Sequence, residues 1–439
     1  MVGFKPTVGL VSRTHIVPIS VSQDTAGPIT RTVHQAAELL SVIAGSDPAD
    51  SATRQADAHR VNFAAALSPN SLRGARLGVL RFASTSQLDP AFEAALARVQ
   101  GRLGLIPAEA AEEIDRACRI ERIDMARLRS QTERAGTPIV GLVSQINALC
   151  RDGFGEYCHW GATTQDVTDT ATVLQIRASL EIVDAGLTAI ATALAALAQK
   201  HRLTPMAGRT HLQQAVPVSF GYKMAGLLSA VQRHRERLAQ LAAELGLAQP
   251  VIAWHTQRDT IAEVGAFLGL VGGTLGKLSM DVKLLMQTEV GEVFEPFAPG
   301  RGASSTMPQK RNPISCTYIH AQVAVLRQHA ASLMEAMVGD HERATGPWQI
   351  EWIVLPEAFC LAAGALAHSR SLVEGLEVDA ERMRANLDLT HGLVVAEAVM
   401  MGLAPGMGRE RAHDLVYDLC RVAIAERRAL LDVLVEADR

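Results

Sequence analysis

The sequence predicts a mainly α-helical protein built around a bundle of long helices. Ala and Leu are frequent while aromatic residues make up only 4% of the chain, and Ala and Leu favour helices whereas strands favour branched and aromatic side chains. Apolar residues also recur at spacings of three and four along one stretch, which is typical of a long helix packed against others. These residues are Val173, Ile176, Leu180, Val183, Leu187, Ile190, Leu194 and Leu197.

The composition limits the classes of function. The chain has 439 residues, a hydrophobic content of 48% and a net charge of -4, so it can bury a large core but has no basic excess for nucleic acid or an anionic membrane. Its six cysteines contain no CxxC pair, which argues against a zinc site or a disulfide framework. Without a signal segment or 18 uninterrupted apolar residues, we expect a cytoplasmic protein with a small soluble partner and no membrane span.

The first 96 residues differ from the remainder. They are punctuated by Pro and Gly, with one predicted helix at 30–45 and one buried strand at 75–82. Helical periodicity then predicts an N-terminal helical region (97–165), a central bundle (166–345) and a small C-terminal helical domain (346–439). The apolar seam that begins at Val173 fits a core within one chain and an interface between copies equally well.

Within the predicted bundle, residues 208–221 contain two glycines and Pro217, and we interpret them as a turn that leads into the next helix. A further helix is predicted at 261–285. The next predicted helix starts at Asn312, at the end of a loop at 302–313.

That loop, GASSTMPQKRNP, is rich in hydroxyl groups. Its Oγ atoms and backbone N–H groups can bind an anion, and Lys310 adds positive charge. In such surroundings the alkoxide of a serine becomes accessible enough to take a proton from carbon. Taken alone, however, a segment of this composition is more often a flexible connection.

A second segment, HWGATTQDVTDTA at 159–171, places His159 and a Thr-Thr pair just before the long helix. Hydroxyl groups at a helix entrance suit an anion. Capping of the helix by Thr164 or Asp166 explains the same residue types by stability alone.

A third segment, GRTHLQQ at 208–214, gathers several hydrogen-bond donors and His211, which titrates near neutrality. A lone histidine there would more often be structural. Because three such segments occur in one chain, we predict that they converge on a single site.

Residues from about 97 to 439 resemble the fumarase/aspartase superfamily, whose three signature regions match 159–169, 208–221 and 302–313. The family pattern Gly-Ser-Ser-x-Met-Pro-x-Lys-x-Asn corresponds to Ala303 through Asn312, with only the first glycine replaced. Within the superfamily, bacterial 3-carboxy-cis,cis-muconate cycloisomerases are most similar. That likeness rests on HWGATTQDVTDT, WHTQRDTIAE (254–263), LLMQTEVGEV (284–293) and HERATGPWQIEW (341–352).

The resemblance implies an enzyme of the protocatechuate (β-ketoadipate) branch of aromatic catabolism. It would close 3-carboxy-cis,cis-muconate to a lactone by adding a carboxylate oxygen across a C=C bond, without metal or cofactor. Ser304 would exchange the proton, while His159 and His211 would serve binding or proton delivery. The family further implies a homo-oligomer, a tetramer, and a small polycarboxylate substrate. The residues implied in substrate binding are Thr163, Thr164, Arg209, Thr210, Gln213, Ser305, Met307, Lys310 and Asn312.

A fumarate-releasing lyase resembling adenylosuccinate lyase is the alternative. His211 favours it, because that position resembles the histidine proposed as acid in those lyases. The run from Trp348 to Trp352 argues against it, since an acidic and aromatic segment would repel a nucleotide phosphate.

Two departures from the family suggest a third possibility, an inactive scaffold. Residues 1–96 resemble a fragment of an amidase-signature hydrolase without its nucleophile loop, and Ser20 and Ser22 follow the place of the nucleophile. Family members also carry about thirty further residues between the counterparts of Leu241 and Ala242, which amounts to about eight helical turns. The loss would shorten one bundle helix and expose apolar surface.

Overall fold

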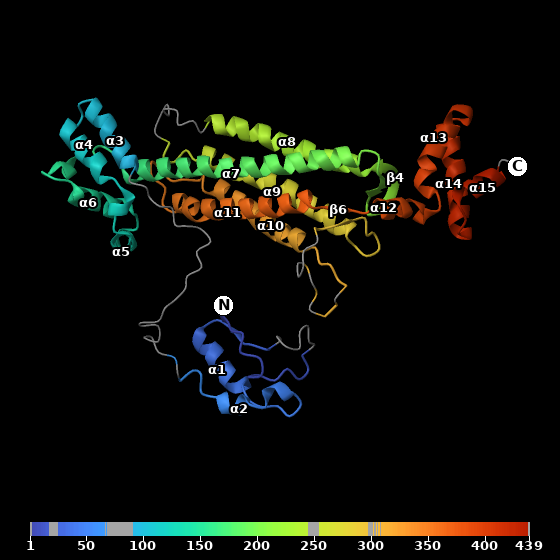
Figure 1. The fold of residues 1–439 in the computed structure, drawn as a ribbon, viewed down its shortest axis with the longest axis horizontal. Coiled ribbons are helices and arrows are strands. Elements are labelled where there is room, and N and C mark those ends of the chain that lie inside the picture. Colours follow the sequence, from blue (N-terminus) through green and yellow to red (C-terminus); the bar gives the residue numbers. More distant parts are fainter. Residues whose placement is uncertain are drawn as a thin grey trace. The chain divides into compact units, whose positions relative to one another are not determined.

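The computed structural model describes residues 2–16, 25–65, 67, 91–244, 254–296, 302, 304, 306–307 and 309–437. The chain divides into two compact units (Figure 1). The smaller unit comprises Met1–Arg81 and Ala298–Asn312, and the larger comprises Phe82–Phe297 and Pro313–Arg439.

In the smaller unit, the predicted helix at 30–45 is α1 (Val33–Ile43). The Oγ1 atom of Thr32 caps it by accepting the Gln35 N–H at 3.2 Å. The guanidinium of Arg13 pairs with the carboxylate of Asp50 at 2.8 Å. The predicted strand at 75–82, Ser20 and Ser22 lie outside the described residues. Other elements described in this unit are β1 (Val2–Gly3), β2 (Ile29–Thr30), the 3-10 helix Ser51–Thr53 and α2 (Ala56–His59).

Five long helices of the larger unit form the predicted bundle (Figure 1). Their buried side chains make one continuous apolar core. The prediction of a mainly α-helical fold with a long-helix bundle is therefore confirmed. The bundle helices are α7 (Thr164–Lys200), α8 (Phe220–Glu244), α9 (Asp259–Leu285), α10 (Ile314–Glu335) and α11 (Pro347–Glu374).

The apolar seam of α7 forms part of that core. Val173 is the most exposed of its first seven residues at 8%, and Leu197 packs partly buried against the cluster. Burial of each such side chain contributes about 1.5–3 kcal/mol relative to exposure. The periodicity therefore identifies the helix face that meets the bundle.

Helices α9 and α10 pack closely because a row of glycines on α9 faces α10. A Cβ atom on Gly265 would lie 2.5 Å from Cδ1 of Leu333, and one on Gly272 would lie 3.2 Å from Cδ2 of Leu326. Side chains on α10 thus occupy the space that larger residues on α9 would need.

Four shorter helices precede the bundle and share a second apolar cluster, which includes Ile114, Leu142 and Ile146. They confirm the helical character that the sequence predicts from Phe92 onward. These helices are α3 (Ala91–Arg102), α4 (Ala108–Ala117), α5 (Met125–Ala135) and α6 (Ile139–Leu149).

Helix α11 packs against α7, α9 and α10, although its residues fall within the predicted C-terminal domain of residues 346–439. The helices beyond it include a separate small cluster around Ala423, Leu430 and Val433. These helices are α12 (Ala380–Leu387), α13 (Ala396–Met407), α14 (Arg409–Glu426) and α15 (Leu430–Ala437).

The turn predicted at 208–221 is instead a β-hairpin of β3 (Pro205–Thr210) and β4 (Gln213–Ser219), paired antiparallel. His211 and Leu212 form its two-residue turn with φ values of 51° and 64°, as a primed hairpin turn requires. A second short pair joins β5 (Val293–Phe294) to β6 (Glu377–Val378).

The predicted shortening after Leu241 falls near the end of α8. Residues 245–253, which follow α8, lie outside the described part of the chain. The loss of a bundle segment there stays a prediction at this point, as do the domain boundaries at 97, 166 and 346.

Candidate active site

The entrance of α7 is built by the first signature segment. Thr163 is the N-cap: its backbone carbonyl accepts the N–H of Asp166 at 3.0 Å, and the Asp166 carboxylate accepts the Thr163 N–H at 2.8 Å. The expected cap at Thr164 is therefore one residue too late, and Asp166, the third helical residue, binds the N-cap through its side chain. The Oγ1 atom of Thr163 also accepts a hydrogen bond from Arg343 at 3.3 Å.

His159 lies just before this entrance and is held by an acidic residue that the sequence analysis missed. Its Nδ1 lies 2.8 Å from Oε1 of Glu93 on α3, and the Glu93 side chain is 1% exposed. The hydrogen bond to Glu93 raises the pKa of His159 above its usual value, against the opposing effect of burial, and Asp166 adds to the increase. The protonated form of this imidazole is therefore more stable here than in a free histidine side chain.

A second histidine, His255, faces the same helix entrance. Its Nε2 lies 2.8 Å from Oδ1 of Asp166, and its backbone carbonyl accepts the Nε2–H of Gln165 at 2.8 Å. His255 belongs to the WHTQRD run that carries the family resemblance. Its hydrogen bond to Asp166 brings the segment just before α9 to the entrance of α7 across 89 residues of sequence, which the sequence alone does not reveal.

Beneath this entrance lies a buried charge network. Arg258, the N-cap of α9, donates to Asp169 at 2.7 Å and to Glu351 at 2.8 Å, and Trp348 Nε1–H donates to Asp169 at 3.1 Å. Arg258, Asp169 and Glu351 are all nearly inaccessible to solvent. Desolvation is the largest cause of the raised pKa of Glu351, with Arg258 opposing it.

The acidic residue in the run from Trp348 to Trp352 is part of this buried network. Glu351 is 2% exposed and paired with Arg258, so its charge does not face a ligand. The expectation that the run from Trp348 to Trp352 would repel a nucleotide phosphate therefore loses the charge on which it rested. This removes the argument against a fumarate-releasing lyase that resembles adenylosuccinate lyase.

The second signature segment forms the β3–β4 hairpin. Arg209 donates to both carboxylate oxygens of Glu292 at 2.8 and 2.6 Å. Glu292 is fully buried and also accepts from Asn386 at 2.8 Å. Arg209 thus anchors the hairpin instead of standing free for a substrate, whereas Thr210, His211 and Gln213 are exposed around the turn.

The first and second segments do not meet within one chain. His159 and Thr163 precede α7, and the hairpin follows it, so the 37 residues of α7 separate them. At 1.5 Å per residue, the helix is about 55 Å long. The prediction that all three segments converge on a single site is therefore wrong for one copy of the chain.

The third segment is described in part. The Oγ atom of Ser304 accepts the backbone N–H groups of Met307 and Thr306 at 3.1 and 3.3 Å. The Asn312 N–H donates to the Gly302 carbonyl at 2.9 Å. Gly302 has a φ of 68°, and a Cβ there would lie 2.6 Å from the Asn312 carbonyl oxygen. Gly302 is therefore the glycine that the loop needs.

Other predicted members of the loop contribute less to this geometry. Met307 and Lys310 are exposed, Asn312 is half-buried, and Ser305 lies outside the described residues. Among the side chains that the structure describes, no group of three or more His, Cys, Asp or Glu could hold a metal ion.

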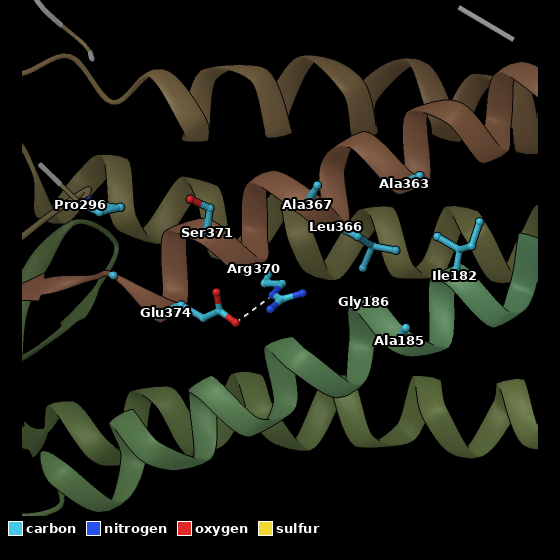
Figure 2. Close-up of a pocket in the computed structure, with 11 residues that line it drawn as sticks. Ile182, Ala185, Gly186, Pro296, Ala363, Leu366, Ala367, Arg370, Ser371 and Glu374 are labelled. Atoms are coloured by element: carbon cyan, nitrogen blue, oxygen red, sulfur yellow. Dashed lines mark hydrogen bonds and ion pairs between the residues drawn. The ribbon is translucent and has the colours of Figure 1, made fainter. Parts of the chain in front are cut away.

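A groove of about 630 Å³ lies elsewhere on the bundle, between α7 and α11 (Figure 2). Ile182 and Gly186 line it from α7, and Leu366 and Ala363 from α11, while Arg370 pairs with Glu374 at its edge. None of the predicted site residues lines this groove.

The bundle helices also leave apolar surface uncovered. Helices α7, α9 and α11 are long and apolar enough to cross a membrane by length and composition alone. Ile182, Leu270 and Ile353, one on each helix, are between 52% and 64% exposed. In a single chain each of these three helices therefore leaves at least one large apolar side chain open to solvent.

Comparison with protein families gives two matches. The family model described as Lyase matches residues 53–253 and 241–326, and the model described as Adenylosuccinate lyase C-terminus matches 392–439. The first match begins inside the segment 1–96 that resembles an amidase fragment.

Curated and solved relatives span most of the chain. Trans-aconitate decarboxylase 1 of Mycosarcoma maydis is 52% identical over 374 residues, covering 78% of this chain and 76% of that protein. The 3-carboxy-cis,cis-muconate cycloisomerase of Pseudomonas aeruginosa is 47% identical over 79% of this chain and 83% of its own length. The crystal structure of the 3-carboxy-cis,cis-muconate lactonizing enzyme from Pseudomonas putida has a TM-score of 0.74 at 43% identity, covering 80% of this chain and 86% of that one.

The alignment with the Mycosarcoma protein is longer than the 78% of this 439-residue chain that it includes. Some positions of the alignment therefore contain a residue of the relative and a gap in this chain. This agrees with a segment missing from this chain.

Proposed function

The chain belongs to the fumarase/aspartase superfamily, and we propose that it is a cycloisomerase that closes 3-carboxy-cis,cis-muconate to a carboxymuconolactone. The observation that carries the proposal is the 47% identity to a cycloisomerase over 79% of this chain. A carboxylate oxygen forms a C–O bond with one alkene carbon, and a proton is added to the neighbouring carbon. The reverse reaction removes that proton and breaks the C–O bond.

Ser304 is the residue that exchanges this proton. The two backbone N–H groups that reach its Oγ stabilise the alkoxide, because hydrogen bonds to a charged form favour that form. Lys310 and Asn312 hold the carboxylate next to the reacting carbon as its charge delocalises. Thr163, Thr164, Thr210 and Gln213 bind the remaining carboxylates, and His159 and His211 take part in binding or proton delivery.

Several copies of the chain build each site. The α7 entrance and the hairpin turn can serve one substrate only when they come from different copies, because α7 separates them within a chain. The exposed apolar residues of α7, α9 and α11 and the groove in Figure 2 supply surface for such an assembly. A tetramer is the form that the family resemblance favours, and a cytoplasmic location completes the proposal.

Decarboxylation of trans-aconitate is a second candidate, favoured by the 52% identical relative of that name. Trans-aconitate and 3-carboxy-cis,cis-muconate are both alkenes with three carboxylates, so one set of carboxylate-binding residues suits either. Release of fumarate from a succinyl compound is a third candidate, because burial of Glu351 removes the objection to it.

The test incubates the purified protein with each substrate class. Loss of the ultraviolet absorbance of 3-carboxy-cis,cis-muconate with lactone formation supports the cycloisomerase. If the muconate is unchanged, release of CO₂ from trans-aconitate would instead support the decarboxylase. Release of fumarate from a succinyl-amine would then support the lyase. A protein that does none of these and sizes as a monomer or an aggregate is the inactive scaffold.

A further inference from the structure

The pair formed by His255 and Asp166 lies at the α7 entrance and has no role in the family-based assignment of site residues. Asp166 uses both carboxylate oxygens: Oδ1 lies 2.8 Å from Nε2 of His255, and Oδ2 accepts the Thr163 N–H at 2.8 Å. The pair therefore connects the start of α9 to the cap of α7.

His255 is held at two points, one on its ring and one on its backbone. Asp166 binds its Nε2 edge, and Gln165, which is fully buried, donates to the His255 carbonyl. Gln165 also donates to Asp169 at 3.2 Å, so the same amide joins His255 to the buried network around Arg258. The ring is 22% exposed. Because the carboxylate accepts from Nε2–H, Nδ1 on the opposite edge is the nitrogen that can serve another group.

The surroundings of this ring suit a carboxylate. Arg343 reaches Thr163 Oγ1 at 3.3 Å, and His159 lies near enough to Asp166 for that carboxylate to affect its titration. The negative charges of Asp166 and Glu93 are each bound to a histidine. Two imidazoles and a guanidinium thus border the same helix entrance, each oriented by a partner within the protein.

We propose that His255 is a further substrate-binding residue, whose Nδ1–H donates to one carboxylate of the polycarboxylate substrate, and that Asp166 is its positioning residue. The inference rests on the proposed function, since it assumes a polycarboxylate at this entrance. With Asp166 on Nε2, the Nδ1 edge of the ring is presented in a fixed direction, so little side-chain freedom is lost on binding.

Two substitutions at His255 distinguish the role of Nε2 from that of Nδ1. His255→Gln keeps an N–H group near the position of Nε2, which preserves the contact with Asp166 and removes the donor at Nδ1. His255→Asn keeps a donor near Nδ1 and gives up the contact with Asp166. His413→Gln is the control, because His413 also lies beside a carboxylate, Asp414 at 3.1 Å, on the exposed face of α14.

Binding is measured by calorimetry with tricarballylate, an unreactive saturated tricarboxylate, and turnover with whichever alkene tricarboxylate the wild type converts. His255→Gln is expected to raise Kd and KM roughly 10- to 100-fold with a smaller change in kcat, as loss of a hydrogen bond to a charged group predicts. Asp166→Asn and His255→Asn are expected to raise KM to a lesser extent, and His413→Gln to change neither constant.

A His255→Gln variant with wild-type Kd and KM would overturn the inference, as would a loss of kcat alone. Circular dichroism and sizing show whether each variant is folded. If His255→Gln does not fold, the folded His255→Asn and Asp166→Asn variants decide, and wild-type KM in both overturns the inference. A folded wild type that neither binds tricarballylate nor converts any tricarboxylate would refute the proposed function itself.

Discussion

Arg258 donates to both carboxylate oxygens of Asp169, at 2.7 and 3.1 Å, from the first turn of α9 to the first turns of α7. The same guanidinium binds Glu351 of α11. Three bundle helices are therefore joined at one end by a single buried cation between two carboxylates. Removal of that cation would leave two buried negative charges without compensation, which is the costly way to break a buried ion pair.

We therefore expect Arg258→Met to lower the free energy of unfolding by about 3–5 kcal/mol. Urea titration followed by circular dichroism measures the change. The control is Arg98→Met, because Arg98 and Asp115 form a solvent-accessible pair at 56% and 30% exposure, for which a change of about 0–1 kcal/mol is expected. Equal effects of the two substitutions would contradict the structural role of the network.

The glycines of α9 give a second prediction. Gly265→Ala places a methyl group 2.5 Å from Leu333 Cδ1, and overpacking of this kind costs about 1–3 kcal/mol. Gly273 lies on the same helix, and a Cβ there would have no neighbouring atom within 4 Å, so Gly273→Ala is expected to stabilise the protein by up to about 1 kcal/mol. Thermal unfolding of both variants tests this. If the unfolding temperature of Gly265→Ala is no lower than that of Gly273→Ala, the close contact of α9 and α10 does not limit the size of the side chain at position 265.

His234 makes stability depend on pH. It is 4% exposed between α8 and α9, where Nε2 lies 2.8 Å from Thr274 Oγ1, and burial lowers its pKa from 6.5 to about 4. As the pH falls, His234 therefore becomes protonated near pH 6.5 in the unfolded chain but only near pH 4 in the folded chain. Stability is complete above pH 6.5 and falls by about 3 kcal/mol as the pH drops to 4.

The measurement is the free energy of unfolding in urea at several pH values between 4 and 7. His234→Gln is expected to flatten this dependence by about 3 kcal/mol relative to the wild type. His413→Gln, which removes an exposed histidine, serves as the control and should leave the slope unchanged. A wild-type slope retained in His234→Gln would show that another group causes it.

The sequence predicts most of the bundle because local periodicity records which face of a helix is buried. The α7 seam from Val173 to Leu194 is an example, since each of its residues is buried. The hairpin at 205–219 resembles a simple turn in sequence because its strands are short and include two prolines. Positive φ at His211 and Leu212 is a property of the folded turn that residue types alone do not reveal.

The site residues also fall into those that a local motif identifies and those that only the folded structure identifies. Ser304, His159 and Thr163 stand in motifs and can be found from the chain itself, whereas Glu93 and His255 are defined by partners 66 and 89 residues away. Arg209 looks like a substrate ligand because its partner, Glu292, follows 83 residues later. Long-range pairing of this kind leaves no local pattern, so sequence reasoning finds motifs better than it finds their partners.

Ser304→Ala tests the assignment of the proton-exchanging residue. Loss of a positioned acid or base is expected to lower kcat by about 10²–10⁴-fold with little change in KM, measured with the tricarboxylate that the wild type converts. The control is Ser332→Ala, because the Ser332 hydroxyl donates only within its own helix, to the Gln328 carbonyl. If Ser304→Ala keeps the wild-type rate, another group must exchange the proton.

Mixed assemblies test whether one site draws on several copies. His159→Gln and His211→Gln each remove a predicted site residue, and these residues lie beyond opposite ends of α7 in one chain. Each variant alone is expected to be nearly inactive. When the two are refolded together, a site that takes each residue from a different copy finds both intact in about one quarter of random combinations. We therefore expect recovery toward one quarter of the wild-type rate per chain, and activity that stays at the sum of the separate variants would contradict a site that takes these two residues from different copies.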